Sequence, residues 1–167
     1  MVVTEPGTVK HGLAPVSGRD PAILILGSYP SSLSLAKNEY YGNPQNQFWK
    51  IIESLLEIDH TIPYTSRIAL LTEQRIALWD VIFTCTREGS ADTAIRDPVP
   101  NDIRGFIEDH PTIRCIALNG NTAGRYFKTM APGLPYIILP STSPANARMT
   151  LAQKTQSWAC ISRDRNR

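Results

Sequence analysis

The sequence predicts an α/β protein, a three-layer α/β/α sandwich around a central four-stranded parallel sheet. Four short apolar runs without regular polar alternation are typical of strands buried on both faces. They cover residues 22–26, 76–83, 113–118 and 136–139. Segments with helical signals separate the runs, and this strand–helix alternation favours parallel strands joined by right-handed crossovers.

The helical signals lie between the predicted strands. Apolar residues at three-to-four-residue spacing within residues 48–56 predict the first helix. Asn101 is expected to cap a second helix that runs to about His110. Asn121 is expected to cap a third over residues 122–128. Each crossover between strands therefore has a candidate helix to cover the sheet.

The chain is expected to form one domain, because 167 residues fit a single core. We expect a flexible N-terminal arm over residues 1–20, a single domain over 21–162 and a basic tail over 163–167. The last helix of the domain is expected over residues 147–162. The stretch 84–100 is expected to be a long excursion over the functional edge of the sheet.

Composition limits the possible classes of function. Apolar residues make up 42% and charged residues 19% of the chain, as in ordinary soluble globular proteins. The net charge of +2 is weak evidence for or against nucleic-acid binding. No membrane segment or secretory signal is recognised, so a cytoplasmic protein is expected. Cys85, Cys115 and Cys160 are widely spaced, so neither a metal site nor a cofactor is expected.

The first loop that could carry chemistry is Gly27-Ser28-Tyr29-Pro30-Ser31, directly after the first strand. In parallel sheets the functional site lies at the carboxyl ends of the strands. Gly27 would allow the backbone to approach a ligand closely. The loop is neither a nucleophile elbow nor a phosphate-binding loop, and an ordinary turn is the alternative interpretation.

A second segment, residues 40–49, combines aromatic rings with uncharged amides, among them Tyr41, Asn43 and Asn46. Rings can stack on a nucleobase, and amides can pair with its edge as donors or acceptors. Phe48 and Trp49 are better interpreted as the start of an apolar helix face.

A third segment follows the last strand and places three hydroxyls between two prolines, ahead of a helix. Hydroxyls and backbone N–H groups near a positive helix end can hold phosphates without lysine. An elaborate helix cap is the alternative. The candidate DNA-contacting residues here are Ser141, Thr142, Ser143, Pro144, Asn146 and, just beyond, Arg148.

Together the three segments resemble the uracil-DNA glycosylase superfamily, above all its mismatch-specific branch and the hypoxanthine-DNA glycosylases. Gly27-Ser28-Tyr29-Pro30 takes the place of the superfamily's Gly-x-Asp/Asn-Pro loop. In the mismatch-specific branch an aromatic residue is followed by the run His-Pro-x-Asn-x-Phe-Trp, and residues 41–49 are similar to this pattern. Residues 140–146 match the Pro-Ser-Thr-Ser-Pro-Ala-Asn form of the hypoxanthine-specific members. The resemblance spans roughly residues 22–160 and implies a uracil-DNA glycosylase-like fold.

The resemblance implies a monofunctional DNA glycosylase of base-excision repair, which hydrolyses the N-glycosidic bond of a flipped deaminated base. Hypoxanthine and uracil are the expected bases, with mismatched thymine as a further possibility. The implied partner is DNA containing such a base, and a monomer is the expected state. Metal and cofactors are not needed for this chemistry.

One residue departs from the pattern. Tyr29 occupies the position that usually carries the water-activating Asp or Asn, and a phenol with a pKa near 10 is a poor base. The resemblance implies that an asparagine of the second segment takes over, with Asn46 as first choice and Asn43 as second. Tyr41 would stack on the base, and Asn119, after the third strand, would read it or serve only as part of a turn.

Two other functions remain open from sequence. A non-catalytic binder of nucleotides or damaged DNA on the same fold is favoured if Asn46 is buried as a helix cap and does not reach a pocket. An α/β hydrolase using Ser28 or Ser141 lacks a persuasive His and Asp.

Overall fold

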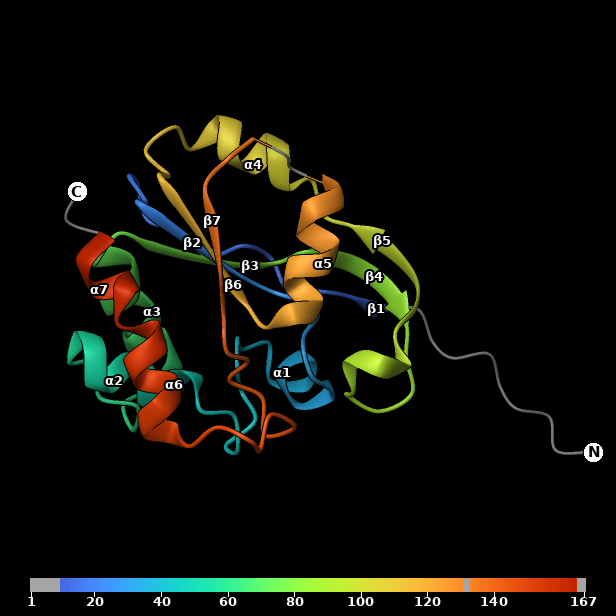
Figure 1. Ribbon diagram of the computed structural model, residues 1–167, viewed down its shortest axis with the longest axis horizontal. Coiled ribbons are helices and arrows are strands. Elements are labelled where there is room, and N and C mark those ends of the chain that lie inside the picture. The colour runs from blue at the N-terminus through green and yellow to red at the C-terminus, as the bar shows by residue number, and fades with distance from the viewer. Residues whose placement is uncertain (1–9, 131–132, 165–167) are drawn as a thin grey trace, which may run out of the picture.

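The computed structural model describes residues 10–130 and 133–164. Its central sheet is four-stranded and parallel, in the order β3-β2-β6-β7, which confirms the predicted architecture (Figure 1). The strands are β2 (Ile23–Gly27), β3 (Ile76–Asp80), β6 (Cys115–Asn119) and β7 (Tyr136–Leu139).

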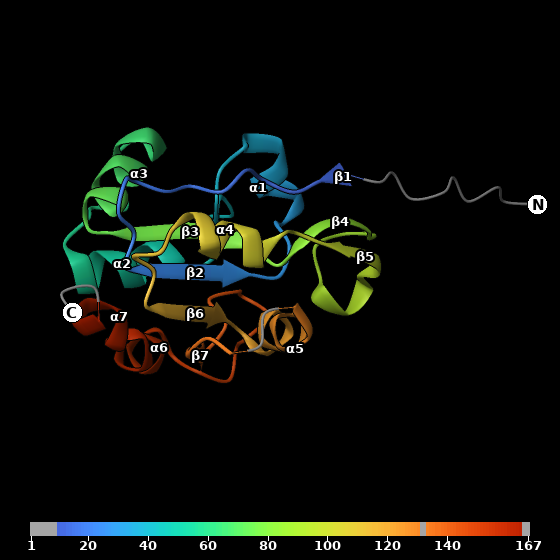
Figure 2. The same cartoon turned by 90° about the horizontal axis from the view of Figure 1, so that it is seen from above.

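Helices cover both faces of this sheet, as the views in Figures 1 and 2 show. One face packs against α2 (Phe48–Leu56), α3 (Tyr64–Glu73), α6 (Leu151–Trp158) and α7 (Cys160–Asp164). The other packs against α4 (Ile103–Asp109) and α5 (Asn121–Met130). Side chains of a strand alternate between faces. Accordingly, Ile23 and Ile25 belong to the first core, and Leu24 and Leu26 to the second.

The helix predicted over residues 48–56 is confirmed, whereas three predicted helix starts are wrong. Asp102, not Asn101, caps α4 by accepting a hydrogen bond from the Gly105 N–H. Asn101 instead donates to the carbonyl of Asp80 at 2.7 Å. Asn121 is the first residue of α5 and does not precede it.

The last predicted helix begins later than expected. Thr150 caps α6 in a reciprocal capping box with Gln153, and Ala159 separates α6 from α7. Two helices were not predicted: α1 (Ser32–Lys37), which Ser31 caps, and α3. None of the described helices has the length and apolar character to cross a membrane.

The run predicted as one strand over residues 76–83 is two strands in two sheets. β3 ends at Asp80, and β4 (Ile82–Thr86) joins β1 (Lys10–His11) and β5 (Arg96–Pro100) in a small antiparallel sheet. The turn at Val81 is fixed by its N–H, which donates to the Gly27 carbonyl. The apolar run is continuous through this turn, so its pattern contained no sign of a break.

The chain around this small sheet is more ordered than a loop. The expected excursion over residues 84–100 contains the end of β4, a 3-10 turn η1 (Asp92–Ala94) and β5. Of the N-terminal arm, β1 pairs with β4 and Val16 bridges Leu78. Residues 1–9 of the arm and 165–167 of the tail lie outside the described residues.

Candidate active site

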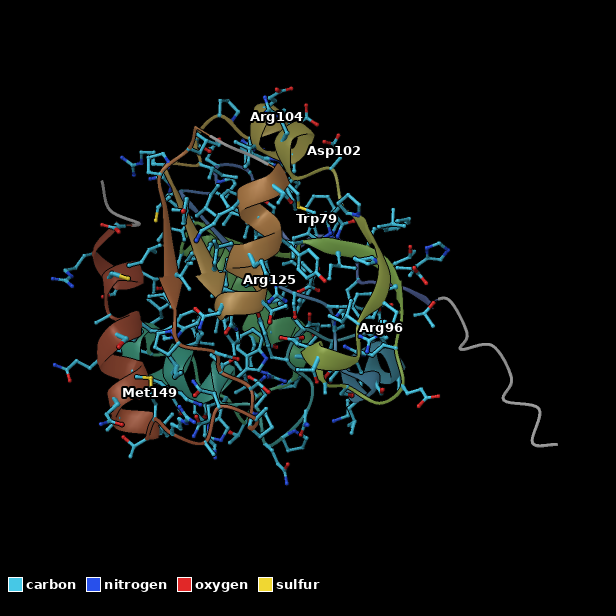
Figure 3. All side chains as sticks on the ribbon, turned by 45° about the vertical axis from the view of Figure 1, so that its right-hand side comes forward. Trp79, Arg96, Asp102, Arg104, Arg125 and Met149 are labelled. Carbon is cyan, nitrogen blue, oxygen red and sulfur yellow. The ribbon has the colours of Figure 1, made fainter. Side chains whose placement is uncertain are left out.

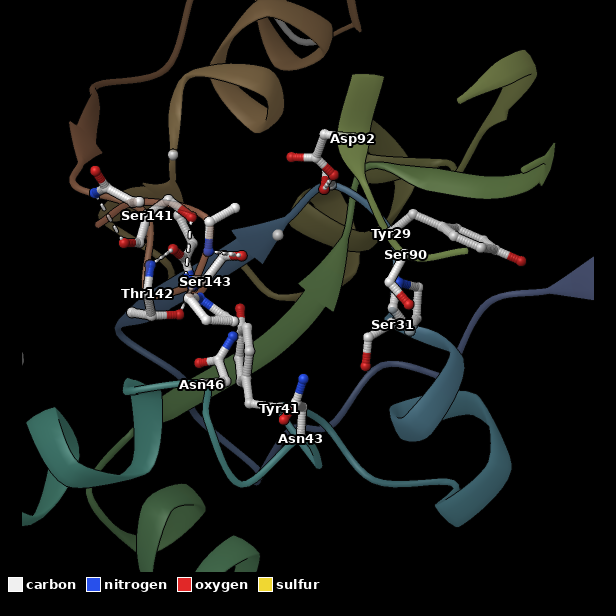
Figure 4. A pocket seen from close by; sticks show the side chains of 18 of the residues that line it. Tyr29, Ser31, Tyr41, Asn43, Asn46, Ser90, Asp92, Ser141, Thr142 and Ser143 are labelled. Carbon is white, nitrogen blue, oxygen red and sulfur yellow. Dashed lines mark hydrogen bonds between the residues drawn. The ribbon is translucent and has the colours of Figure 1, made fainter. Parts of the chain in front are cut away.

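A cavity of about 910 Å³ lies at the carboxyl ends of the central strands, where the sequence predicted the site (Figure 4). Its walls come from the loops after β2, β6 and β7, from the segment before α2, and from η1. The lining includes Gly27, Ser28, Tyr29, Pro30, Tyr41, Asn43, Asn46, Asn119, Ser141, Thr142, Ser143, Pro144 and Asn146. Of the predicted site residues, only Arg148 is not part of the lining, and its side chain is exposed.

The Tyr29 side chain turns away from the cavity (Figure 4). Tyr29 is 8% exposed and belongs to the core cluster that includes Leu26 and Cys85, with the Arg87 guanidinium 4.9 Å from its ring centroid. Burial raises the pKa of the phenol above its ordinary value. This position therefore offers no ionisable base to a ligand in the cavity.

Tyr41 presents an aromatic wall. Its backbone is left-handed, with φ of 55°, and its ring stacks on Phe48 with centroids 4.0 Å apart. Burial raises the pKa of its phenol, which stays neutral. The hydroxyl makes no hydrogen bond of good geometry among the described residues, although the adjacent Asn119 amide lowers the phenol pKa against the larger effect of burial.

Asn46 lines the cavity and also secures the start of α2. Its Oδ1 accepts a hydrogen bond from the Phe48 N–H at 2.9 Å. Asn43 makes a similar local bond, accepting from the Gln45 N–H at 2.9 Å. An amide oxygen has two lone pairs and the amide nitrogen two protons. The N-cap residue of α2 is Gln47 and Asn46 is half-buried in the cavity lining, so Asn46 is not buried as a helix cap and keeps groups that can face a ligand.

The loop after β7 is held by an internal network of hydrogen bonds. Asn119 Oδ1 accepts from the Thr142 N–H and Asn119 Nδ2 donates to Thr142 Oγ1, both at 3.0 Å. Asn146 Nδ2 donates to the Ser141 carbonyl at 3.1 Å, and Trp158 Nε1 donates to the Pro140 carbonyl at 2.9 Å. The Asn119 amide, expected to read a base, thus holds the loop in place.

Asp80, which the sequence analysis did not single out, also lines the cavity. It ends β3 directly beside Gly27, its partner in the parallel register. A Cβ on Gly27 would lie 2.5 Å from Asp80 Oδ1 and 3.3 Å from the Tyr41 hydroxyl oxygen. The missing side chain at Gly27 therefore makes room for the carboxyl group.

The Asp80 carboxyl group is 4% exposed, and its Oδ2 is buried without a hydrogen-bond partner among the described residues. Burial raises its pKa to about 7; the nearby charge of Asp92 adds to this rise and Arg87 opposes it. An acidic residue at the end of an apolar run was the available signal. It was missed because the run was interpreted as one strand through Phe83.

Two residues of the 84–100 stretch tie it to the first loop. Ser28 Oγ donates to Asp92 Oδ1 at 2.7 Å, and an Arg87 guanidinium nitrogen donates to the Pro30 carbonyl at 2.6 Å. The excursion thus closes one side of the cavity and brings a second carboxylate near Asp80.

The start of α5 adds positive potential to the opposite side. Asn121, its first residue, lines the cavity, and the first N–H groups of a helix have no partner within the helix. Arg125 follows one turn later and is exposed (Figure 3). The site thus offers donors suited to an anion next to a neutral aromatic wall.

Comparison with known proteins gives a consistent result. The model of the Uracil DNA glycosylase superfamily matches residues 15–162. A "Hypoxanthine DNA glycosylase" of Methanosarcina acetivorans is 38% identical over 93% of this chain and 99% of its own length. Another of that name, from Methanosarcina barkeri, is 37% identical over 90% and 96%. A solution NMR structure from M. acetivorans, described as a candidate uracil DNA glycosylase, superposes with a TM-score of 0.82 at 36% identity, covering 96% of this chain and 100% of that one.

Proposed function

The chain belongs to the Uracil DNA glycosylase superfamily and is a DNA glycosylase, and from this premise we propose that hypoxanthine in DNA is its substrate. Two relatives that align with at least nine-tenths of the chain are named for that base. The position of the usual water-activating residue carries Tyr29, whose ring lies in the core. A mechanism that avoids that position is therefore required.

The observation that carries the proposal is the place of Asn46 in the cavity wall, near the stacking surface of Tyr41. A base inside a duplex must be flipped out to be reached. The face of Tyr41 that is not packed on Phe48 would stack on it, a contact worth about 1–3 kcal/mol. Asn46 would hold a water beside C1′. An amide is not a proton acceptor of useful strength, so it would position the water without deprotonating it.

Bond cleavage leaves positive charge on the sugar and negative charge on the departing base. The phosphates of the DNA would stabilise the sugar. Backbone donors of Ser28 and Tyr29 and the start of α5 would face the base, in the manner of an oxyanion hole. These donors are fixed before the substrate arrives, so little reorganisation is needed in the transition state.

The DNA backbone would be held by the loop after β7. The hydroxyls of Ser141 and Ser143 would donate to phosphates, and the hydrogen bonds from the Ser143 N–H to Ser141 Oγ and from the Thr142 N–H to Asn119 fix the loop that carries them. Arg148, exposed beside this loop, would meet a phosphate or fill the space of the flipped nucleotide. We further propose that the protein acts as a monomer on DNA wherever its host keeps the genome.

The test is a cleavage assay on labelled duplexes with a single hypoxanthine, uracil, xanthine or mismatched thymine, followed by alkali. We expect strand breaks at hypoxanthine, and Asn46→Ala to lower the rate by about 10²–10³-fold, the effect of losing a well-placed polar group. Gln156→Ala, an exposed amide on α6 outside the cavity, is the matched control and should retain full activity.

Other outcomes assign the function differently. Breaks only at uracil or thymine would keep the enzyme class and reject hypoxanthine. Full activity of Asn46→Ala would move the water-positioning role to Asn43 or another residue. Binding of damaged duplex without any cleavage would favour the non-catalytic binder.

A further inference from the structure

The mechanism proposed above, in which Asn46 positions the water, gives no role to the buried carboxyl group of Asp80 in the same cavity. Asp80 is 4% exposed, lines the cavity and has a partnerless Oδ2 among the described residues. A buried polar atom without a partner is costly. Such an atom is therefore expected to gain a partner when the cavity is filled.

The position of Asp80 restricts which part of a substrate it can meet. Its carboxyl group and the Tyr41 hydroxyl both border the space beside Gly27, and Asp80 is almost fully shielded from solvent. A flipped nucleotide enters base first, because its sugar stays attached to the DNA backbone at the rim. The deep carboxyl group would therefore meet heteroatoms of the base, whereas C1′ and the attacking water stay nearer the rim.

The surroundings of Asp80 favour a carboxyl group that carries a proton near neutral pH. Asp92 raises its pKa together with burial, and Arg87 lowers it. The other titratable groups that interact with it are the phenols of Tyr29, Tyr40 and Tyr41, all neutral because burial raises their pKa values. A general acid works best when its pKa is close to the working pH.

We propose that Asp80 is a catalytic general acid that protonates N7 of the flipped hypoxanthine as the bond from C1′ to N9 breaks. This inference rests on the proposed function, because a pyrimidine has no N7. Asp80 would thereby assist the departure of the base, which Asn46 cannot do because its amide carries no acidic proton.

The step balances without a further reactant. The electron pair of the C1′–N9 bond moves to the base while the Asp80 proton moves to N7, so neutral N7–H hypoxanthine leaves. Water adds to the cationic C1′ and loses one proton. That proton restores the Asp80 acid, directly or through solvent, and the products are an abasic site and free hypoxanthine.

The experiment compares the wild-type protein with Asp80→Asn on duplexes containing deoxyinosine or 7-deaza-2′-deoxyinosine, under single-turnover conditions. The analogue carries C–H in place of N7. We expect Asp80→Asn to slow deoxyinosine cleavage by about 10²–10⁴-fold. The wild type should cleave the analogue more slowly than deoxyinosine by a similar factor. Asp80→Asn should cleave the analogue at the same rate as the wild type does.

The pH profile provides a readout that needs no variant. Wild-type cleavage of deoxyinosine should fall about tenfold per pH unit above pH 7, and the residual activity of Asp80→Asn should not. Asp109→Asn, an exposed carboxylate at the end of α4, is the matched control and should behave as wild type. Duplex binding and the melting temperature establish that Asp80→Asn is folded.

Several results would overturn the assignment. Full activity of Asp80→Asn, normal wild-type cleavage of the analogue, or an equal further loss for the variant on the analogue would each remove N7 as the target. Failure of the proposed function gives a different pattern, in which the wild type leaves deoxyinosine intact. Cleavage of uracil alone that depends on Asp80 would place its action elsewhere than at N7.

Discussion

Two parts of the cavity differ in how their polar atoms are satisfied. In the loop wall, Asn119 and Thr142 bond to each other twice, and Trp158 secures the Pro140 carbonyl. The second part, called the floor below, is the space beside Gly27 that is bordered by the Asp80 carboxyl group and the Tyr41 hydroxyl. There, Asp80 Oδ2 and the Tyr41 hydroxyl oxygen are buried without a good hydrogen-bond partner among the described residues. The loop wall is complete before substrate arrives, as preorganised binding requires. The floor is not complete, and a ligand bound there would supply the missing partners.

Among the substitutions that test this comparison, the largest effect on cleavage is expected from filling the floor. In Gly27→Ala the new methyl would lie 2.5 Å from Asp80 Oδ1, so the carboxyl group or the strand must shift. A misplacement of this kind should lower deoxyinosine cleavage by about 10²-fold. Cleavage and duplex binding are measured together, and affinity for undamaged DNA should persist. Unchanged cleavage would show that the base does not approach Gly27.

Breaking the loop wall should mainly affect stability. Asn119→Ala removes the two hydrogen bonds between the Asn119 amide and Thr142, which is 0% exposed, and should lower the free energy of unfolding by about 2–4 kcal/mol. Denaturant unfolding measures this change. Thr142→Val removes only the hydroxyl and should cost about half as much. Equal stability of all three proteins would contradict a structural role for Asn119.

A substitution in the floor, Asp80→Asn, should raise the stability of the protein, whereas the substitutions in the loop wall lower it. The fold raises the Asp80 pKa from 3.8 to about 7. Between these two pH values the folded protein therefore keeps a proton that the unfolded chain releases. Wild-type stability should therefore fall as pH rises from about 4 to 7. Asp80→Asn lacks this loss and should be more stable by about 1–3 kcal/mol at pH 8, with the difference vanishing near pH 4. Melting curves over this range test it, and a less stable variant at pH 8 would contradict the assignment.

The smallest effect is expected outside both regions. Arg148→Ala should leave the single-turnover rate unchanged and reduce the slope of log affinity against log salt by about one, if the side chain meets one phosphate. Arg104→Ala, an exposed arginine on α4, should leave the slope unchanged. A large loss of rate in Arg148→Ala would instead favour insertion into the space of the flipped base.

Local sequence patterns were sufficient to predict the fold class, which the structure confirms, and to propose where the candidate site lies. Apolar runs and intervening helices depend on local periodicity, so the four parallel strands were predictable, and with them the edge where their loops meet. The loops at residues 27–31, 41–49 and 140–146 were identified as site segments for the same reason, since each follows a strand or opens a helix. Their convergence on one cavity agrees with that prediction.

Which side chains face the cavity depends on contacts between segments that are far apart in the sequence. The Tyr29 ring packs against the guanidinium of Arg87, which also donates to the Pro30 carbonyl across a separation of 57 residues. The bonds of Asn119 depend on a loop 23 residues away. Asp80 becomes buried because β3 ends in register with Gly27, which has no side chain to occupy the space. Burial and pKa arise from contacts between distant segments, and local sequence patterns do not contain them.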